Sequence, residues 1–322
     1  MSQEKPIVVV ALGGHAFMRH KMPPTHEEHQ ISAQIISEIL MELINRNYNV
    51  IITHGNGPQV GNLLIQNEIS QSQVPPQPLD VLVAMTEGSL GYIMQQSLLN
   101  ELKKVGLEKY VVTKITQVVV DEDDEAFKNP TKPIGPFLSE EEALKRKNEL
   151  GWNVVEDSGR GWRRIVPSPI PIKVIQRHTI RDAAKQGHIV IAGGGGGIPI
   201  VKRRDASGNE YYAGVEAVID KDLTSALLAK QVGAELFIIL TDVEQVYINF
   251  RKPDQQALGA LTIEMIEKYQ REGHFAVGSM GPKIGAVMNF LRDGGKRALI
   301  TSPSGLKDAL AGLTGTHFVG RI

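Results

Sequence analysis

Short apolar runs alternate along the chain with longer segments in which apolar residues recur every three or four positions. The runs at 7–12, 50–53, 188–192 and 236–240 are almost wholly apolar, and each is followed by glycine or polar residues. Uninterrupted apolar runs of this length are typical of strands that are buried on both faces of a parallel sheet. Their alternation with helical patterns predicts an α/β protein.

The rest of the pattern predicts further elements. A long helical region is expected at 79–102, interrupted at 86–88 and at Gly91, and a strand-like run is expected at 111–120. A hairpin is expected at 200–213. We also expect helices near 30–45, from 59 onward, and at 139–150, 179–186, 223–232, 262–270, 284–291 and 306–310, with a last strand at 297–300.

Glycine-rich turns follow three of the predicted strands, at 13–16, 55–58 and 193–197. Ligands of open α/β sheets bind at the carboxyl ends of strands, and glycines let the backbone approach an anion and point N–H groups at it. Ordinary strand-to-helix turns use glycine too, but two matching turns favour a site. The five consecutive glycines at 193–197 need a steric reason, and close approach of a phosphate is the simplest one. Neither a Walker motif nor a dinucleotide fingerprint is present.

Residues 121–171 differ in composition from the rest of the chain. The segment opens with an acidic cluster at 121–125, contains both tryptophans and is bordered by prolines. This shift predicts an inserted subdomain or lid, the alternative being an ordered excursion with no catalytic part. Its basic group, Arg160, Arg163 and Arg164, could hold phosphate or could pair with the acidic cluster.

Composition excludes several classes of protein. The charge is nearly balanced, with 35 basic and 36 acidic residues, which argues against a nucleic-acid partner. The absence of cysteine excludes disulfides and thiolate metal sites. No apolar run is long enough to span a bilayer, and the first residues lack a signal peptide's apolar core. We therefore expect a cytoplasmic protein without a membrane partner.

Charged residues supply the candidate chemistry. Asp220, Lys221 and Asp222 stand at the head of a helical pattern, where such a triplet is usually a solvated cap. Lys132 and Lys283 stand in similarly glycine- or proline-punctuated segments. Three lysines around a transferring group, with Asp222 orienting two of them, would suit phosphoryl transfer, which needs mainly positioning and positive charge. The hydrolase motifs G-x-S-x-G and H-E-x-x-H are both missing.

Several long motifs resemble those of the carbamate kinase family. They lie at 11–14, 53–61, 129–133, 156–163, 194–199, 214–223, 240–243 and 278–283. The resemblance implies the amino acid kinase fold, a three-layer αβα sandwich whose mostly parallel open sheet has about eight strands, with a small protruding lid. It implies the reaction ATP + carbamate ⇌ ADP + carbamoyl phosphate with Mg²⁺, usually running towards ATP in arginine catabolism, in a homodimer.

The resemblance also implies roles for individual residues. Lys221 and Lys283 would contact the transferring phosphoryl group, Lys132 would reach in from the lid, and Asp222 would organise the lysines. The residues expected around carbamate are Gly13, Gly14, His15, Gly55, Asn56 and Gly57. Those expected along the nucleotide are Gly194, Gly195, Gly196, Asp220, Asp242, Val243, Met280 and Gly281. No protein ligand to the metal is expected, because Mg²⁺ would be held mainly by the nucleotide phosphates.

Two lobes are expected on the same ground. Residues 1–212, with the lid inserted at about 121–171, would form an N-terminal lobe on the carbamate side. Residues 213–322 would form a C-terminal, nucleotide-binding lobe.

The sequence departs from the family's pattern at two places. The usual Gly-Gly-Asn-Ala reads Gly13-Gly14-His15-Ala16, and the usual Met-Ser-Gln-Gly reads Met85-Thr86-Glu87-Gly88. Either the ring of His15 replaces the amide and activity survives, or the protein has reduced activity or a different acceptor. A nucleotide-binding protein with little catalysis is the alternative function. Glu87 must be paired or turned away if it faces an anionic substrate.

Overall fold

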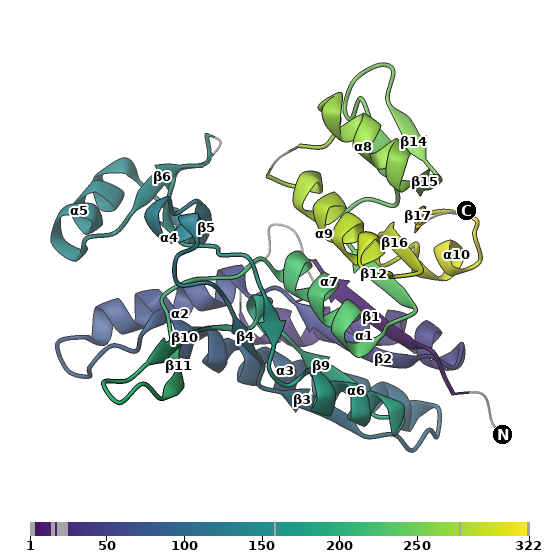
Figure 1. Cartoon of the computed structure of the whole chain (residues 1–322), viewed down its shortest axis with the longest axis horizontal. Coiled ribbons are helices and arrows are strands. Elements are labelled where there is room, and N and C mark those ends of the chain that lie inside the picture. Colours follow the sequence, from purple (N-terminus) through teal and green to yellow (C-terminus); the bar gives the residue numbers. More distant parts are fainter. Residues whose placement is uncertain (1–3, 14–16, 18–24, 158, 277, 321–322) are drawn as a thin grey trace.

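Eight strands form a central sheet with helices on both of its faces (Figure 1). The computed structural model describes residues 4–13, 17, 25–157, 159–276 and 278–320 of the 322. The sheet is mostly parallel, which confirms the predicted αβα class. Its strands, in spatial order, are β15 (Ala260–Thr262), β17 (Thr316–Val319), β16 (Arg297–Thr301), β12 (Leu236–Leu240), β1 (Ile7–Leu12), β2 (Asn49–His54), β9 (Ile189–Ala192) and β3 (Val111–Lys114).

Helices cover both faces of this sheet. Along β1, Val8 and Val10 point into one core and Val9 and Ala11 into the other, so the strand is apolar throughout. The first core is closed by α1 (His26–Asn45), α3 (Leu79–Lys104) and α10 (Leu306–Leu310). The second is closed by α6 (Arg177–Lys185), α7 (Lys221–Val232), α8 (Ile263–Arg271) and α9 (Met280–Arg292).

The four middle strands determine where a site can form. β12, β1, β2 and β9 are neighbours and run parallel, so their carboxyl ends meet at one edge of the sheet. The chain leaves these strands at Leu240, Leu12, His54 and Ala192, immediately before segments that the sequence marked as candidate loops.

Two smaller sheets and a ribbon complete the fold. A four-stranded sheet consists of β11 (Glu210–Gly214), β10 (Ile198–Arg204), β4 (Gln117–Val119) and β8 (Lys173–Val174). β10 and β11 confirm the predicted hairpin. The ribbon pairs β13 (Val246–Ile248) with β14 (Gln256–Leu258).

The remaining sheet projects from the body beyond α2 (Gly57–Ser70), at the upper left of Figure 1. The sheet consists of β5 (Lys132–Leu138), β7 (Trp162–Val166) and β6 (Val154–Glu156). Together with α4 (Glu125–Lys128) and α5 (Glu140–Leu150), it forms a unit that we call the lid. Its base packs tightly on α2, because a Cβ on Gly61 would come within 2.1 Å of the Cα of Gly135. α5 begins at a capping box, since Ser139 and Glu142 bond each other's backbone N–H groups.

Three predictions were wrong in detail. The run at 111–120 is two strands in different sheets, because the chain turns at Ile115 and Thr116. The helix at 79–104 is uninterrupted; Gly91 lets α3 approach β3, where a Cβ would meet the side chain of Thr113 at 2.3 Å. The last strand is β17 rather than the run at 297–300. Among the described residues, no helix is long and apolar enough to cross a membrane.

Candidate active site

The carboxylate of Asp222 lies between two of the candidate lysines. Its Oδ1 is 2.9 Å from the Nζ of Lys221, and its Oδ2 is 3.5 Å from the Nζ of Lys283. Lys221 begins α7 and Lys283 lies in the first turn of α9, so the aspartate joins the two helix starts. The side chain of Asp222 is only 4% exposed. Burial of a single carboxylate is costly, and the two ammonium groups offset that cost.

Asp220 caps the same helix and holds the third lysine. Its Oδ1 accepts hydrogen bonds from the N–H groups of Asp222 and Leu223, and its Oδ2 accepts one from Lys132 at 2.7 Å. Burial disfavours the charged carboxylate, but Lys132 and then Lys221 outweigh it and hold the pKa of Asp220 below its usual value. In this cluster three ammonium groups face two carboxylates, which leaves one positive charge uncompensated.

The loop after β2 is fixed by buried polar contacts. The Nδ1 of His54 lies 3.0 Å from the carbonyl of Gly55, and the ring packs edge-on against Phe17. Burial, helped by the charge of Lys221, lowers the pKa of His54 to about 4, so its ring is neutral at pH 7. The Nδ2 of Asn56 donates to the hydroxyl of Thr86 on α3 at 2.8 Å.

The five-glycine loop follows β9 and contains the short helix η2 (Gly194–Gly196). Gly193, Gly195, Gly196 and Gly197 have φ angles of 64°, 66°, 94° and 83°, which only glycine adopts readily. A Cβ on Gly195 would meet the Nδ2 of Asn56 at 2.2 Å. A Cβ on Gly196 would meet the carbonyl oxygen of Ile219 at 2.3 Å. Close packing of the two loops and of the segment before Asp220 therefore accounts for the glycines, a reason that the sequence did not reveal.

Other expected residues lie at the same edge of the sheet. Gly13 follows β1, and its N–H donates to the carbonyl of Leu240 at the end of β12. Asp242 and Val243 follow β12, whereas Met280 and Gly281 begin α9 beside Lys283. Gly55 and Gly57 flank Asn56. Gly14 and His15 lie outside the described residues.

The arginines of the lid do not pair with the acidic cluster at 121–125. Arg160 and Arg163 both pair with Asp157, at 3.0 and 3.2 Å, and both lie over the ring of Phe137. Arg164 stacks on Trp152 at 4.8 Å. In the acidic cluster, Glu122 pairs with Arg203 of β10 and Glu125 with Lys128. Arg160 and Arg163 thus make contacts within the lid, whereas Arg164 also lies 3.9 Å from Glu216 of the body.

The side chains that the structure describes at this edge do not form a metal cage. Among the described residues, no group of three or more histidine, aspartate or glutamate side chains could hold a metal ion. Asp220 and Asp222 are already engaged with lysines. All four oxygens of these two carboxylates already accept hydrogen bonds from ammonium or backbone N–H groups.

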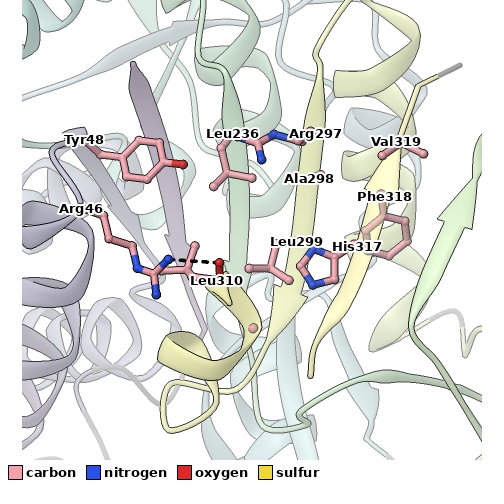
Figure 2. Close-up of a pocket in the computed structure, with 11 residues that line it drawn as sticks. Arg46, Tyr48, Leu236, Arg297, Ala298, Leu299, Leu310, His317, Phe318 and Val319 are labelled. Atoms are coloured by element: carbon pink, nitrogen blue, oxygen red, sulfur yellow. Dashed lines mark hydrogen bonds between the residues drawn. The ribbon is translucent and has the colours of Figure 1, made fainter. Parts of the chain in front are cut away.

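A pocket at the opposite edge of the sheet is separate from this site. Figure 2 shows that Arg46, Tyr48 and His317 line it. It has a volume of about 120 Å³ and includes Leu236 and Arg297, the first residues of β12 and β16. The lysine cluster lies beyond the other ends of these parallel strands, so this pocket takes no part in the chemistry considered above.

Comparison with known proteins decides the family. The family model described as "Amino acid kinase family" matches residues 6–302. The chain belongs to the amino acid kinase family. Within that family it is 48% identical to a carbamate kinase of Thermococcus kodakarensis over 97% of this chain and 98% of the relative. It is 44% identical to a carbamate kinase-like protein of Escherichia coli over 98% of this chain and 99% of the relative.

Solved amino acid kinase structures agree with the fold. A carbamate kinase from Giardia lamblia bound to AMP-PNP superposes with a TM-score of 0.90 at 39% identity, covering 98% of this chain and 99% of the other. The resemblance to carbamate kinases drawn from the motifs is therefore confirmed.

Sequence reasoning missed several polar residues that fix this amino acid kinase site. The hydroxyl oxygens of Thr53 in β2 and Ser225 in α7 lie 2.5 Å apart and share a hydrogen bond. Thr116 accepts a hydrogen bond from the N–H of Gly193 at 2.9 Å. All three are small hydroxyl residues beside other polar positions, and no local pattern in the sequence distinguishes them.

Proposed function

We propose that this protein is a carbamate kinase, which transfers a phosphoryl group reversibly between ATP and carbamate. The observation that carries the proposal is the cluster in which Asp222 holds Lys221 and Lys283 while Asp220 holds Lys132. It lies beside the loops at the carboxyl ends of β1, β2, β9 and β12. Near-half identity to the carbamate kinase of Thermococcus kodakarensis supports carbamate as the acceptor.

The cluster suits the electrostatic demands of phosphoryl transfer. A carbamate oxygen forms a bond to the γ-phosphorus of ATP while the bond from that phosphorus to the β,γ-bridging oxygen breaks, and ADP leaves with the electron pair. Negative charge develops on the equatorial and leaving oxygens, and fixed ammonium groups stabilise it. Asp222 keeps Lys221 and Lys283 in place, so little reorganisation is needed when the substrates bind. No covalent intermediate with the protein is required.

The proposal extends to the other residues of the site. Gly13, Gly55, Asn56 and Gly57 would surround carbamate, with Gly14 and His15 contributing from outside the described residues. Asp242, Val243, Met280 and Gly281 would lie along the nucleotide together with Gly194, Gly195, Gly196 and Asp220. Mg²⁺ would enter as the MgATP complex, held by phosphate oxygens. We retain residues 1–212 as the carbamate-side lobe, 213–322 as the nucleotide lobe and about 121–171 as the lid.

The proposal is tested by running the reaction towards ATP. Purified protein incubated with ADP, Mg²⁺ and carbamoyl phosphate should form ATP, measured by luciferase luminescence. We expect this direction in arginine or related carbamoyl-compound catabolism. A folded protein that forms no ATP above background would rule the activity out.

His15 motivates the alternative, a carbamate kinase-like protein with an altered acceptor or little catalysis. If ADP binds without turnover and His15→Asn restores ATP formation, the alternative holds. If turnover is normal with carbamoyl phosphate and no other small acid or amide accepts phosphate from ATP, the alternative is excluded.

A homodimer and a cytoplasmic location complete the proposal. A groove between α1 and α3 is lined by Ile31, Ile35 and Ile93 together with five polar residues, and Tyr92 of α3 is 58% exposed. Apolar residues gathered between two long helices favour a face that a second copy covers. Light scattering should give twice the 35.3 kDa mass of the chain. Ile31→Glu with Ile35→Glu should give monomers; a monomeric unaltered protein would contradict the proposal. We place the protein in the cytoplasm because ATP and Mg²⁺ are available there.

A further inference from the structure

Glu87 is a buried carboxyl group directly beneath the two loops of the site. It lies in the middle of α3 and is 2% exposed. Its Oε2 accepts a hydrogen bond from the N–H of Thr116 at 2.8 Å. Its Oε1 is buried and has no hydrogen-bond partner among the described residues. A carboxylate would be costly in this position, because one of its charged oxygens is unpaired.

Thr116 connects Glu87 to the five-glycine loop. The hydroxyl of Thr116 accepts from the N–H of Gly193 at 2.9 Å, and its carbonyl accepts from the N–H of Ile198 at 2.8 Å. These two bonds hold the first residue of the loop and the residue that follows it. Glu87 therefore acts on both ends of the loop through one intermediate residue.

The preceding residue of α3 acts on the other loop. The hydroxyl of Thr86 accepts from the Nδ2 of Asn56 at 2.8 Å and donates to the carbonyl of Val83 at 2.7 Å. The side chain of Asn56 in turn occupies the space that a Cβ on Gly195 would need. Two consecutive residues of one helix thus set the spacing between the Asn56 loop and the glycine loop.

No cation in the described part of the chain pairs with Glu87. The end of β2 contributes His54, and β3 contributes the half-buried Lys114, while Lys221 of α7 acts on His54. Burial raises the pKa of Glu87 well above its ordinary value, and the backbone N–H groups of Thr116 and Gly194, which favour the charged form, oppose this only in part. Among the described residues, no lysine or arginine forms an ion pair with Glu87.

The imidazole of His54 lies close to the same carboxyl group. Its Nε2 is 2.7 Å, and the Cγ of Glu87 is 3.1 Å, from the point that a Cβ on Gly194 would occupy. Because the Nδ1 of His54 faces the carbonyl of Gly55, that nitrogen carries the proton and Nε2 is left as an acceptor.

We propose that Glu87 is a positioning residue, which works as an uncharged carboxylic acid and fixes the glycine loop against the Asn56 loop through Thr116. This inference rests on the proposed function, because the two loops matter as the walls of the phosphoryl-transfer site. A neutral acid has the shape and the hydrogen-bonding groups of the glutamine that stands here in the family's usual motif. The negative charge at this position is thereby removed, and the departure from the motif leaves the site intact.

Glu87→Gln tests the charge state. We expect kcat and KM within about twofold of the unaltered protein near neutral pH. At alkaline pH the unaltered protein should lose activity as the acid ionises, and Glu87→Gln should not show that loss. The melting temperature of Glu87→Gln should rise above that of the unaltered protein as the pH increases from 5, because the unaltered protein must keep a proton on the carboxyl group to stay folded. Glu101→Gln, on the same helix and also buried, is the matched control and should keep the pH–rate profile of the unaltered protein.

Two further variants test the positioning role. Glu87→Leu cannot accept from the N–H of Thr116, and Thr116→Val cannot accept from Gly193. Each should lower kcat by about tenfold or more and raise the KM for ADP, since misplaced groups slow phosphoryl transfer steeply. Thr116→Val should keep the alkaline loss, since Glu87 remains.

Three results would overturn the inference. One is a Glu87→Gln enzyme slowed more than about tenfold near neutral pH, which would make the carboxylate the working form. Another is an identical dependence of melting temperature on pH in Glu87→Gln and the unaltered protein. The third is unchanged kinetics in both Thr116→Val and Glu87→Leu. The melting measurements need no turnover, so they decide the charge state of Glu87 even if the protein makes no ATP.

Discussion

The ammonium of Lys132 lies 2.7 Å from the Oδ2 of Asp220, and this contact joins the first residue of the lid's β5 to the N-cap of α7. The other oxygen of Asp220 caps the helix, so one carboxylate serves both the lid and the helix start. The two functions can be separated by substitution.

Asp220→Asn should keep the cap and lose the ion pair, because its amide oxygen can still accept from the backbone of α7. We expect a melting temperature close to that of the unaltered protein and a clear loss of kcat. Asp220→Ala removes both contacts and should cost about 1 kcal/mol of unfolding free energy in addition. Denaturant unfolding and initial rates of ATP formation measure the two effects. Equal stability of the two variants would show that Asp220 does not cap the helix.

Lys221→Ala and Lys283→Ala should each lower kcat by at least about 100-fold, because each removes an ammonium group that stabilises charge in the transition state. Circular dichroism will verify that both variants fold. Lys230→Ala is the matched control, since Lys230 lies on the same α7 and forms a half-exposed pair with Asp293. An unchanged rate in either lysine variant would reject its role.

Gly196→Ala should abolish most activity and destabilise the protein. The new Cβ would lie 2.3 Å from the carbonyl oxygen of Ile219 and would require a φ of +94°. Gly208→Ala is a control with similar backbone strain, at a φ of +84°, but with no atom within 4 Å of the new Cβ. It should cost only about 1 kcal/mol and leave kcat unchanged. If both variants behave alike, strain rather than packing explains the glycines.

The stability of the protein should fall in mild acid because of His54. Its pKa is about 4 in the folded protein and 6.5 in an ordinary environment, so the unfolded chain binds an extra proton between these values. The contribution of the neutral ring is complete above pH 6.5 and is lost as the pH falls towards 4, by about 3 kcal/mol in all. Urea unfolding of the unaltered protein and of His54→Gln at several pH values should show this difference. Parallel curves would contradict it.

Much of the sheet could be predicted because strands buried on both faces are written as continuous apolar runs. β1 and β12 were located at their observed limits on this signal. β17 was missed because Thr316–Val319 is short and alternates between buried and half-buried positions. β5 was missed because it contains Pro133 and Pro136; it lies at the edge of its sheet, where proline is tolerated.

The charged residues of the site could be predicted from the sequence, but most of the residues that hold the loops in place could not. The three lysines were recognisable because each lies in a segment that contains glycine or proline. Their distances to Asp220 and Asp222, however, depend on where α7 and α9 begin. Glu87 was visible as a departure from a motif, yet its burial depends on how closely α3 approaches the glycine loop. No local sequence pattern predicts the distance between two elements that are far apart in the chain.

The order of the central sheet also bears on how the chain must fold. β1 lies between β2 and β12, and Val8 pairs with Leu236, more than 200 positions later. During synthesis, β1 therefore lacks one of its two neighbouring strands until β12 has emerged. Pairings so distant in sequence slow folding and expose apolar edges meanwhile. The loops of the site follow strands on both sides of the pairing between β1 and β12, so the site is complete only after that pairing has formed.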